Sequence, residues 1–425
     1  MKDTELKKRL SQLWKDTFHD SDEYISLIFD NYFDENLCAY EVIDGEVVAG
    51  LLGVPYNFGN SDNKVSGLYL CGLATKPKYR SRGLMTKLLS EINQKAKEGG
   101  YAFTFLIPAD MGLRKYYHDR EYVNAFYRII DNYTSVHDFD IEYEAVLQEH
   151  KNKAIDIKRR YYASLKVEEI NIDSPENDDL VNAVIKMIME QESSQDGLQI
   201  IHSEKDLYNI IKENIISSGT VFVVHNSNGE VTGVAFTTVA ENGTVVNIHK
   251  MYVSDIASRY KAMSAIKTKF EQMAIKHYVS TVEMDRKALW SRSYGSYMAD
   301  AAQVPTISVT ERVYSLADHA KVYGMVKVLD LPEILKFQAN VRRDLKYSIL
   351  AKGEYEYTFD KFDVRDGKLF IKQLSMDNLT PSQAAYVMSK RDICEIVFRR
   401  RDTDNLVTEA FGIPSINASI SLLLD

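Results

Sequence analysis

The chain has 425 residues, of which 45% are hydrophobic and 27% are charged. At roughly 100 to 200 residues per domain, this length corresponds to two to four globular units, and the composition excludes disordered, collagen-like and low-complexity proteins. The net charge of −9 disfavours nucleic-acid binding, because contacts with a phosphate backbone need clustered Lys and Arg. It suits a cationic small molecule as a partner.

No apolar stretch approaches the roughly 20 residues that cross a bilayer, and the charged residues 1–8 contain no signal-peptide core. We therefore expect a cytoplasmic protein without a membrane partner. The three cysteines, Cys38, Cys71 and Cys394, form no close pair, which argues against a disulfide framework and a zinc ribbon. The histidines show no metal-ligand spacing, so we expect chemistry without a metal ion.

The first 35 residues predict two helices. Leu6, Leu10 and Leu13 recur at helical spacing, which indicates one buried helical face. Asp20 and Glu23 then have the spacing of a capping box, which predicts that Asp20 caps a second helix.

A hairpin, a strand, a helix and a buried strand are predicted next. The apolar runs 39–43 and 47–54 flank an Asp-Gly step, which is the strongest short-range signal for a hairpin. A strand at 67–75 leads into a basic turn, and a helix from Leu84 ends at a Gly-Gly pair. Residues 101–107 then read as a buried strand.

This order of elements partly recurs in the middle of the chain. Strands are predicted at 221–224, 231–236 and 245–253, and a helix at about 258–274. The second copy has no glycine beside Arg259 where the first has its basic glycine turn. We interpret this as a duplicated domain whose second copy is degenerate.

Three domains are therefore predicted, with boundaries at 1–150, 151–310 and 311–425. In the third, Asp330 precedes Leu331-Pro332, the pattern of a capped helix start with proline in the first turn. This unit mixes helices and strands and contains no catalytic motif that we can identify.

Residues 80–85, RSRGLM, contain the pattern R-x-x-G between a strand and a helix. A helix N-terminus offers unpaired N–H groups and a partial positive charge, glycine lets the backbone approach an anion, and the arginines add charge. An isolated R-x-x-G is more often a basic, solvent-facing turn. The flanking strand, helix and buried strand favour a pyrophosphate-binding turn instead.

This turn resembles the acetyl-CoA motif Q/R-x-x-G-x-G/A of the GCN5-related N-acetyltransferases (GNAT), although Met85 departs from the final small residue. Residues 74–85, ATKPKYRSRGLM, are more similar to the enhanced-intracellular-survival (Eis) subfamily, in which proline precedes a basic R-x-R-G-L turn. The resemblance implies an α+β (mixed α/β) protein with two tandem GNAT-type domains, the second degenerate, and a C-terminal domain like sterol carrier proteins. It also implies a homo-oligomer, by family analogy a hexamer.

The resemblance further assigns roles to single residues. Leu73 and Thr75 would offer main-chain groups to the pantetheine arm of acetyl-CoA. The phosphates would be held by Arg80, Arg82, Gly83, Leu84, Met85 and Thr86. Tyr117 aligns with the tyrosine that protonates the departing CoA thiolate, although Glu121 stands where the family has glycine. On spacing alone, Tyr117 would be an ordinary half-buried tyrosine in a chain that has 27 of them, and the upstream turn favours catalysis.

The general base is harder to identify. Neither Asp110 nor His118 is clearly positioned by the sequence to accept a proton from the attacking amine. In the Eis subfamily the terminal carboxylate of the chain reaches the active site, and the tail here is apolar and ends in Asp425. The resemblance therefore implies that the carboxylate of Asp425 accepts the amine proton.

We thus expect an acetyl-CoA-dependent N-acetyltransferase that acts on an amine of a small polar or cationic acceptor, by direct transfer in a ternary complex. An aminoglycoside, a polyamine or a lysine would fit. Two alternatives remain open: a non-catalytic acyl-CoA-binding regulatory protein, and a transferase of aminoacyl or fatty acyl groups, which would not explain the third unit. The acceptor and the acyl chain length also remain open.

Overall fold

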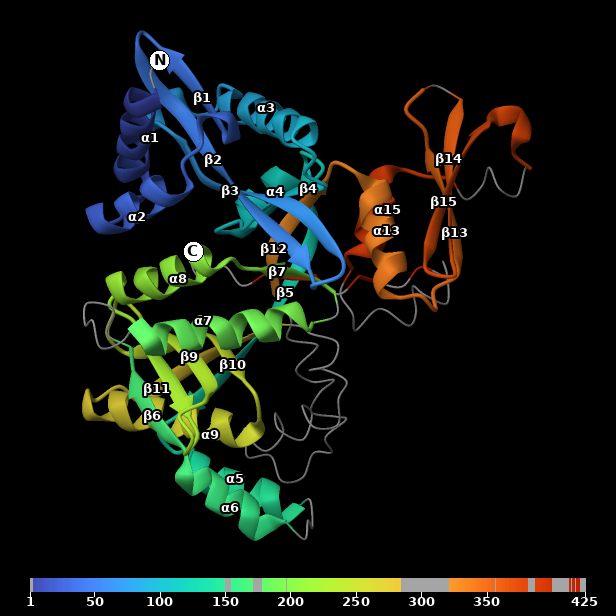
Figure 1. Ribbon diagram of the computed structural model, residues 1–425. Coiled ribbons are helices and arrows are strands. Elements are labelled where there is room, and N and C mark those ends of the chain that lie inside the picture. The colour runs from blue at the N-terminus through green and yellow to red at the C-terminus, as the bar shows by residue number, and fades with distance from the viewer. Residues whose placement is uncertain are drawn as a thin grey trace. The chain divides into compact units, whose positions relative to one another are not determined.

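The computed structural model shows a mixed α/β protein, which confirms the predicted fold class (Figure 1). The structure describes residues 3–149, 154–170, 178–195, 197–283, 321–355, 357–380, 387–399, 413, 415–416 and 418–420. The chain divides into two compact units. The first comprises Met1–Phe126, Gln195–Ile201 and Val322–Ile420, and the second comprises Tyr127–Ser194, His202–Lys321 and Ser421–Asp425. Within the described residues, no helix is long and apolar enough to cross a membrane.

The first unit begins with the two predicted helices, α1 (Asp3–Phe18) and α2 (Asp22–Tyr32). The cap predicted for α2 is wrong by one residue. Ser21 has the extended conformation of a cap, and its side chain accepts a hydrogen bond from the N–H of Tyr24 at 3.1 Å. The carboxylate of Asp20 instead accepts a hydrogen bond from the indole N–H of Trp14 at 2.7 Å, so a tertiary contact uses the group that the sequence assigned to the cap.

The predicted hairpin is confirmed. It consists of β1 (Cys38–Ile43) and β2 (Glu46–Gly59), and its turn residues Asp44 and Gly45 have φ values of 51° and 79°. Positive φ at both positions is the backbone conformation of the type I′ hairpin turn, which explains the Asp-Gly pair.

The central strands follow in the predicted order. β3 (Lys64–Thr75) pairs antiparallel with β2, and β4 (Phe103–Leu106) pairs parallel with β3. The connection between β3 and β4 contains the short helix η2 (Pro77–Tyr79) and helix α3 (Leu84–Glu98). Figure 1 shows α1 and α2 on one side of the hairpin and α3 on the other, so that the sheet is covered on both faces. The short helices η1 (Glu35–Leu37) and α4 (Met111–His118) complete this region.

A strand from a distant segment completes the sheet of the first unit. β12 (Lys321–Val328) pairs antiparallel with β4 and places Met325 opposite Leu106. The strand that follows α4, β5 (Val123–Thr134), continues into the second unit, where it pairs antiparallel with β11 (His277–Glu283). The sheet of the first unit therefore depends on residues far beyond the segment that forms β1 to β4.

The second unit repeats the strand pairing of the first. β8 (Thr220–His225) and β9 (Val231–Val239) form a hairpin, β10 (Val245–Val253) pairs antiparallel with β9, and β11 pairs parallel with β10 after helix α9 (Ile256–Gln272). The predicted internal repeat is confirmed by this order. The other elements of the unit are α5 (Phe139–Glu149), α6 (Ile155–Ser164), β6 (Lys166–Glu169), α7 (Asp178–Ser193) and α8 (Glu204–Ile216).

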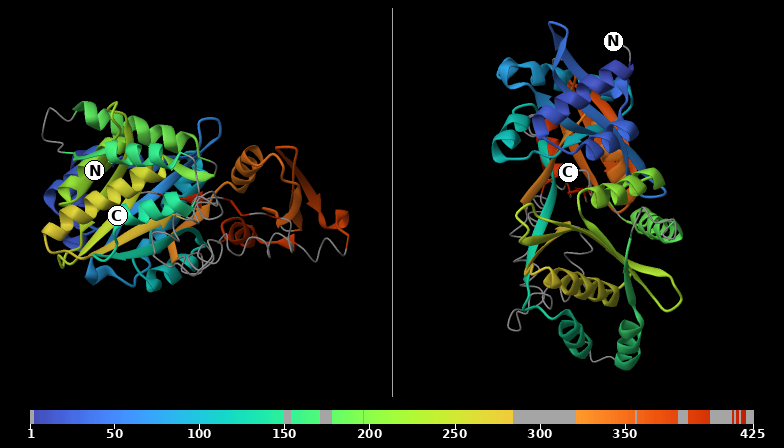
Figure 2. Two further views of the ribbon diagram at one scale, coloured as in Figure 1. Left: turned by 90° about the horizontal axis from the view of Figure 1, so that it is seen from below. Right: turned by 90° about the vertical axis from the view of Figure 1, so that its left-hand side faces the viewer.

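Helices cover both faces of this second sheet as well (Figure 2). Val221 and Val223 of β8 belong to a core cluster with α7 and α8, whereas Phe222 and Val224 belong to a cluster with α9. This alternation is why β8 reads as a continuous apolar run.

The last part of the first unit is a small α+β arrangement. Its sheet has the order β15-β14-β13-β16, and Asp330 caps α13 by accepting a hydrogen bond from the N–H of Glu333 at 3.0 Å, as predicted. The elements are α13 (Leu331–Val341), β13 (Tyr347–Lys352), β14 (Thr358–Arg365), β15 (Lys368–Ser375), η4 (Met376–Asn378), β16 (Val387–Met388) and α15 (Lys390–Val397). β7 (Leu198–Ile201) and β17 (Ala418–Ser419) pair parallel with each other. The domain boundaries predicted from the sequence stay predictions.

Candidate active site

The end of β3 contains a β-bulge. Its pairing with β2 shifts between Cys71 and Ala74, where Gly72 and Leu73 together lie opposite Leu51. A bulge removes main-chain groups from the regular ladder and bends the strand, and both effects are common beside active sites. The bulge includes Leu73 and is separated from Thr75 by one residue; these are the two residues expected to offer main-chain groups to a pantetheine arm.

Trp14 explains why the bulge needs glycine. Gly72 has φ +60°, and a Cβ at this position would lie 2.3 Å from the Trp14 ring. We expect Gly72→Ala to lower the free energy of unfolding by roughly 2 to 4 kcal/mol, from backbone strain and overpacking together. Gly100→Ala is the matched control, because Gly100 has φ +80° and no atom of a described residue lies within 4 Å of a Cβ there. Urea unfolding that gave equal losses for both variants would contradict the packing argument.

The N-terminus of α3 is open. Gly83 precedes the helix with φ +77°, and its carbonyl accepts the N–H of Lys87 at 3.1 Å. No described side chain caps this end, the first turn contains no acidic residue, and a Cβ at Gly83 would have no described atom within 4 Å. The unpaired N–H groups of the first turn are thus available to an anion.

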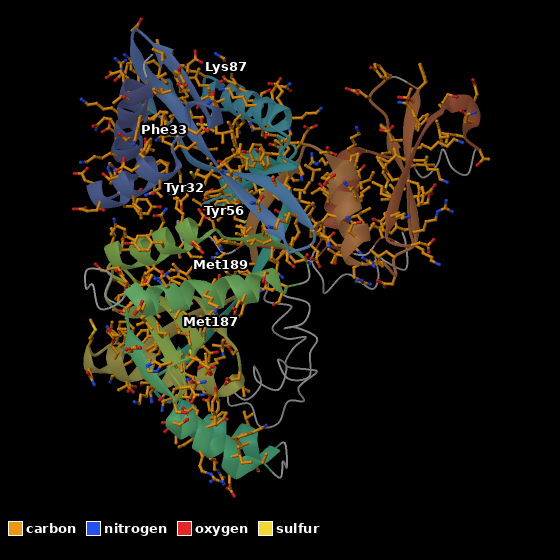
Figure 3. All side chains as sticks on the ribbon, in the orientation of Figure 1. Tyr32, Phe33, Tyr56, Lys87, Met187 and Met189 are labelled. Carbon is orange, nitrogen blue, oxygen red and sulfur yellow. The ribbon has the colours of Figure 1, made fainter. Side chains whose placement is uncertain are left out.

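Two arginines are anchored in the turn before this helix. The Nε of Arg80 donates to the carbonyl of Thr75 at 3.0 Å, and the guanidinium of Arg82 lies 5.1 Å from the ring centre of the buried Tyr79. Lys87, one turn into α3, instead forms an ion pair with Glu41 at 2.6 Å (Figure 3). The arginines therefore supply the positive charge at the turn itself.

The corresponding helix of the second unit, α9, has a carboxylate at its N-terminus. Asp255 accepts the N–H of Ser258 at 2.8 Å, and its other oxygen accepts the hydroxyl of Tyr161 at 2.9 Å. Arg259 donates to the hydroxyl of Tyr133 at 3.2 Å. Because Asp255 already satisfies the helix N-terminus with a negative charge, a phosphate would be repelled there.

Tyr117 lies on α4 and is 6% exposed. Its ring packs edge-on against Tyr116 and Tyr122, with centroid distances of 5.4 and 5.9 Å. The same core cluster includes Leu73, Leu84 and Met85 as partly buried members, so the structure brings Tyr117 together with the bulge and the start of α3. Burial raises the pKa of Tyr117 well above its usual range, which keeps its hydroxyl protonated at neutral pH.

The neighbouring Tyr122 has a different environment. Its fully buried hydroxyl bonds to Thr104 Oγ1 at 3.0 Å and donates to Asn93 Oδ1 at 3.3 Å. No hydrogen bond to a described residue is among the causes of the raised pKa of Tyr117, which is set mainly by burial. Tyr122 is thus part of a structural network, whereas the proton of Tyr117 is available for transfer.

Arg120 is a site residue that the sequence did not single out. Its Nε and Nη2 donate to Thr86 Oγ1 at 3.0 and 2.7 Å, and its guanidinium stacks 3.4 Å from the ring centre of Tyr116. Thr86 Oγ1 also lies 3.2 Å from the hydroxyl of Tyr116. These contacts tie the end of α4 to the first turn of α3. The feature of the sequence that could have pointed to Arg120 is its position three residues after Tyr117.

The structure assigns structural roles to two of the residues considered as bases. Asp110 caps α4 by accepting the N–H of Leu113 at 2.7 Å, and His118 lies 3.6 Å from the carboxylate of Glu395. Asp425 lies outside the described residues. Within the described part of the chain, no three His, Cys, Asp or Glu side chains are arranged to hold a metal ion.

Comparisons with known proteins agree with this geometry. Residues 1–123 match the family model of the acetyltransferase (GNAT) domain. No curated protein sequence matches the chain significantly. Solved structures resemble it along nearly its whole length. One is a conserved protein of unknown function from Enterococcus faecalis, described as a probable N-acyltransferase, with a TM-score of 0.65 and 10% identity over 98% of this chain and 97% of that one. A GCN5-related N-acetyltransferase from Anabaena variabilis has a TM-score of 0.62 and 12% identity over 97% of this chain and 95% of that one. Eis1 from Mycobacterium abscessus has a TM-score of 0.57 and 9% identity over 97% of this chain and 91% of that one.

At these identities the structural likeness shows the fold, and the family model adds the activity. The bulge at Gly72, the open turn at Gly83 and the buried Tyr117 all lie within the matched residues 1–123. The protein is therefore an enzyme, an acetyltransferase whose N-terminal domain is of the GNAT type.

Proposed function

We propose that the protein transfers the acetyl group of acetyl-CoA directly to an amine of a small polar or cationic acceptor. The open N-terminus of α3 at Gly83 carries this proposal, because it combines unpaired N–H groups with two anchored arginines. A pyrophosphate fits these groups by charge and by hydrogen-bond direction.

In the proposed reaction the amine nitrogen attacks the thioester carbonyl, and the bond from carbon to sulfur breaks. Main-chain N–H groups of the bulge at Leu73 would stabilise the developing negative charge on oxygen. The CoA thiolate leaves and takes a proton from Tyr117, whose raised pKa keeps that proton in place beforehand. The amine proton passes to a carboxylate, which we propose to be that of Asp425.

Several parts of the proposal rest on the sequence. The net charge of −9 supports a cationic acceptor such as an aminoglycoside, a polyamine or a lysine. The resemblance to the Eis subfamily supports a sterol-carrier-like C-terminal domain and a homo-oligomer. The cytoplasmic location stays an expectation from the sequence.

An assay of thiol release from acetyl-CoA across a panel of amines tests the proposal. We expect turnover with at least one aminoglycoside, polyamine or lysine derivative and none without an amine. Tight binding of acetyl-CoA without thiol release from any amine would instead support the alternative, a regulatory protein that binds acyl-CoA.

A second experiment tests the role of Asp425. Residues added after Asp425 move the main-chain carboxylate without changing the turn at Gly83. The extended protein should therefore keep its affinity for acetyl-CoA, and its turnover should fall by a factor of roughly 10² to 10⁴, the usual range for loss of a general base. An N-terminal extension is the control. Equal turnover in the untagged and C-terminally extended proteins would rule out this carboxylate as the base.

A further inference from the structure

The turn that follows Tyr117 contains a residue in a strained conformation. Glu121 has φ +68°, in the left-handed region that costs a non-glycine residue roughly 1 to 2 kcal/mol. Such a conformation persists when surrounding contacts hold it in place. The contacts of Glu121 therefore show what fixes the turn.

This turn closes on the backbone of Tyr117 itself. The carbonyl of Tyr117 accepts the N–H of Arg120 at 2.8 Å and the N–H of Tyr122 at 3.2 Å. The second bond spans Glu121 and forms only if Glu121 takes its left-handed conformation. A change at Glu121 would thus move the C-terminal end of α4, which carries Tyr117.

Lys327 holds the turn from the neighbouring strand. Its Nζ donates to the carboxylate of Glu121 at 2.8 Å and to the carbonyl of Arg120 at 3.3 Å. Lys327 lies on β12, opposite Thr104 of β4, so the sheet fixes its position. The ion pair with Lys327 lowers the pKa of Glu121, so this carboxylate is ionised at neutral pH.

We infer that Lys327 is a positioning residue for acetyl transfer: by holding Glu121 in its left-handed conformation, it fixes the end of α4 and the hydroxyl of Tyr117. The inference rests on the proposed function, in which Tyr117 is the acid. It gives a role in the reaction to a residue far outside the matched residues 1–123, and it explains why the enzyme needs β12 beside β4. Sub-ångström errors in the position of a catalytic group are enough to slow a reaction.

The test is a double-mutant cycle between Lys327 and Glu121. Lys327→Met should lower kcat roughly tenfold and leave the KM for acetyl-CoA within about twofold, because Lys327 bonds to the Glu121 turn and not to the turn at Gly83. Glycine adopts positive φ without strain. In the Glu121→Gly background, Lys327→Met should therefore lower kcat less than twofold. A merely stabilising ion pair would instead leave kcat unchanged in Lys327→Met. A double variant as slow as Lys327→Met, or a rise in KM without a fall in kcat, would overturn the inference.

Lys336→Met is the matched control, since Lys336 forms an exposed ion pair with Glu333 on α13 and should leave kcat unchanged. Hydrogen exchange supplies a measurement that does not need turnover. The N–H of Tyr122 should exchange at least tenfold faster in Lys327→Met and recover in the double variant. If the wild type turned over no amine, the proposed function would fall, and with it the catalytic part of the inference. If Tyr117→Phe slowed turnover while Lys327→Met did not, this inference alone would fall.

Discussion

Replacing Gly83 with Asp is expected to abolish acetyl-CoA binding and to leave the fold intact. The new carboxylate would lie beside the unpaired N–H groups of α3 and repel a pyrophosphate. Loss of two charge-assisted hydrogen bonds, each worth about 1.5 kcal/mol, corresponds to an affinity lower by roughly 100-fold or more. Stability should change little, because the strain of a positive φ and the favourable charge at a helix N-terminus are of similar size.

Gly45→Asp is the control for this experiment. Gly45 has φ +79° against +77° for Gly83, and in the described part of the chain no atom lies within 4 Å of a Cβ at either position, so the backbone strain is matched. Gly45 lies in the β1–β2 hairpin, and its substitution should leave affinity unchanged. Calorimetry that found the same acetyl-CoA affinity in Gly83→Asp and the wild type would contradict the assignment of the phosphate site.

In the second unit, an aspartate stands before the helix that corresponds to α3. At the start of α9, Asp255 occupies the position before the helix and bonds to Ser258 and Tyr161. The sequence predicted that this copy lacks the binding turn because it lacks the glycine. The structure adds a second reason, since a carboxylate already occupies the helix N-terminus. We expect acetyl-CoA to bind the first unit and not the second.

Local patterns in the sequence identified the two N-terminal helices, the first hairpin, the strands and helix around the basic turn, and the corresponding strands and helix of the second unit. The Asp-Gly step identified the hairpin at Asp44, and Asp330 identified the start of α13. The positions of β5 and β12 could not be predicted in this way. Each pairs with a strand distant in sequence, and periodicity within a strand carries no information about its partner.

The same distinction applies to the candidate site. Gly83 was predicted because its role depends on neighbours in the chain, between a strand and a helix. The bulge at Gly72 depends on pairing with β2 and on contact with Trp14, and the turn at Glu121 depends on Lys327. Glu121 keeps the left-handed conformation because its carboxylate forms an ion pair with Lys327, which lies on another strand. That compensation is visible only in the folded chain.

Replacing Tyr117 with Phe is expected to lower kcat by roughly 10² to 10⁴, the range for loss of a general acid, without changing the KM for acetyl-CoA. No hydrogen bond to a described residue contributes to the pKa of Tyr117, so removal of its hydroxyl should change the free energy of unfolding by less than about 0.5 kcal/mol. The acid must be protonated to act, and burial raises the pKa of Tyr117 above its usual value of 10. Wild-type turnover should therefore show no loss from this group as the pH rises from 7 to about 9.

For Tyr122→Phe we expect the opposite: a loss of stability with little change in kcat. It removes a buried hydroxyl that bonds to Thr104 and Asn93, which should cost about 1 to 2 kcal/mol of stability and leave kcat within a few-fold of the wild type. Steady-state kinetics and urea unfolding on both variants separate the two roles. If Tyr122→Phe abolished turnover and Tyr117→Phe did not, the assignment of the acid would move to Tyr122, and the turn held by Glu121 would have to present that side chain to the thiolate.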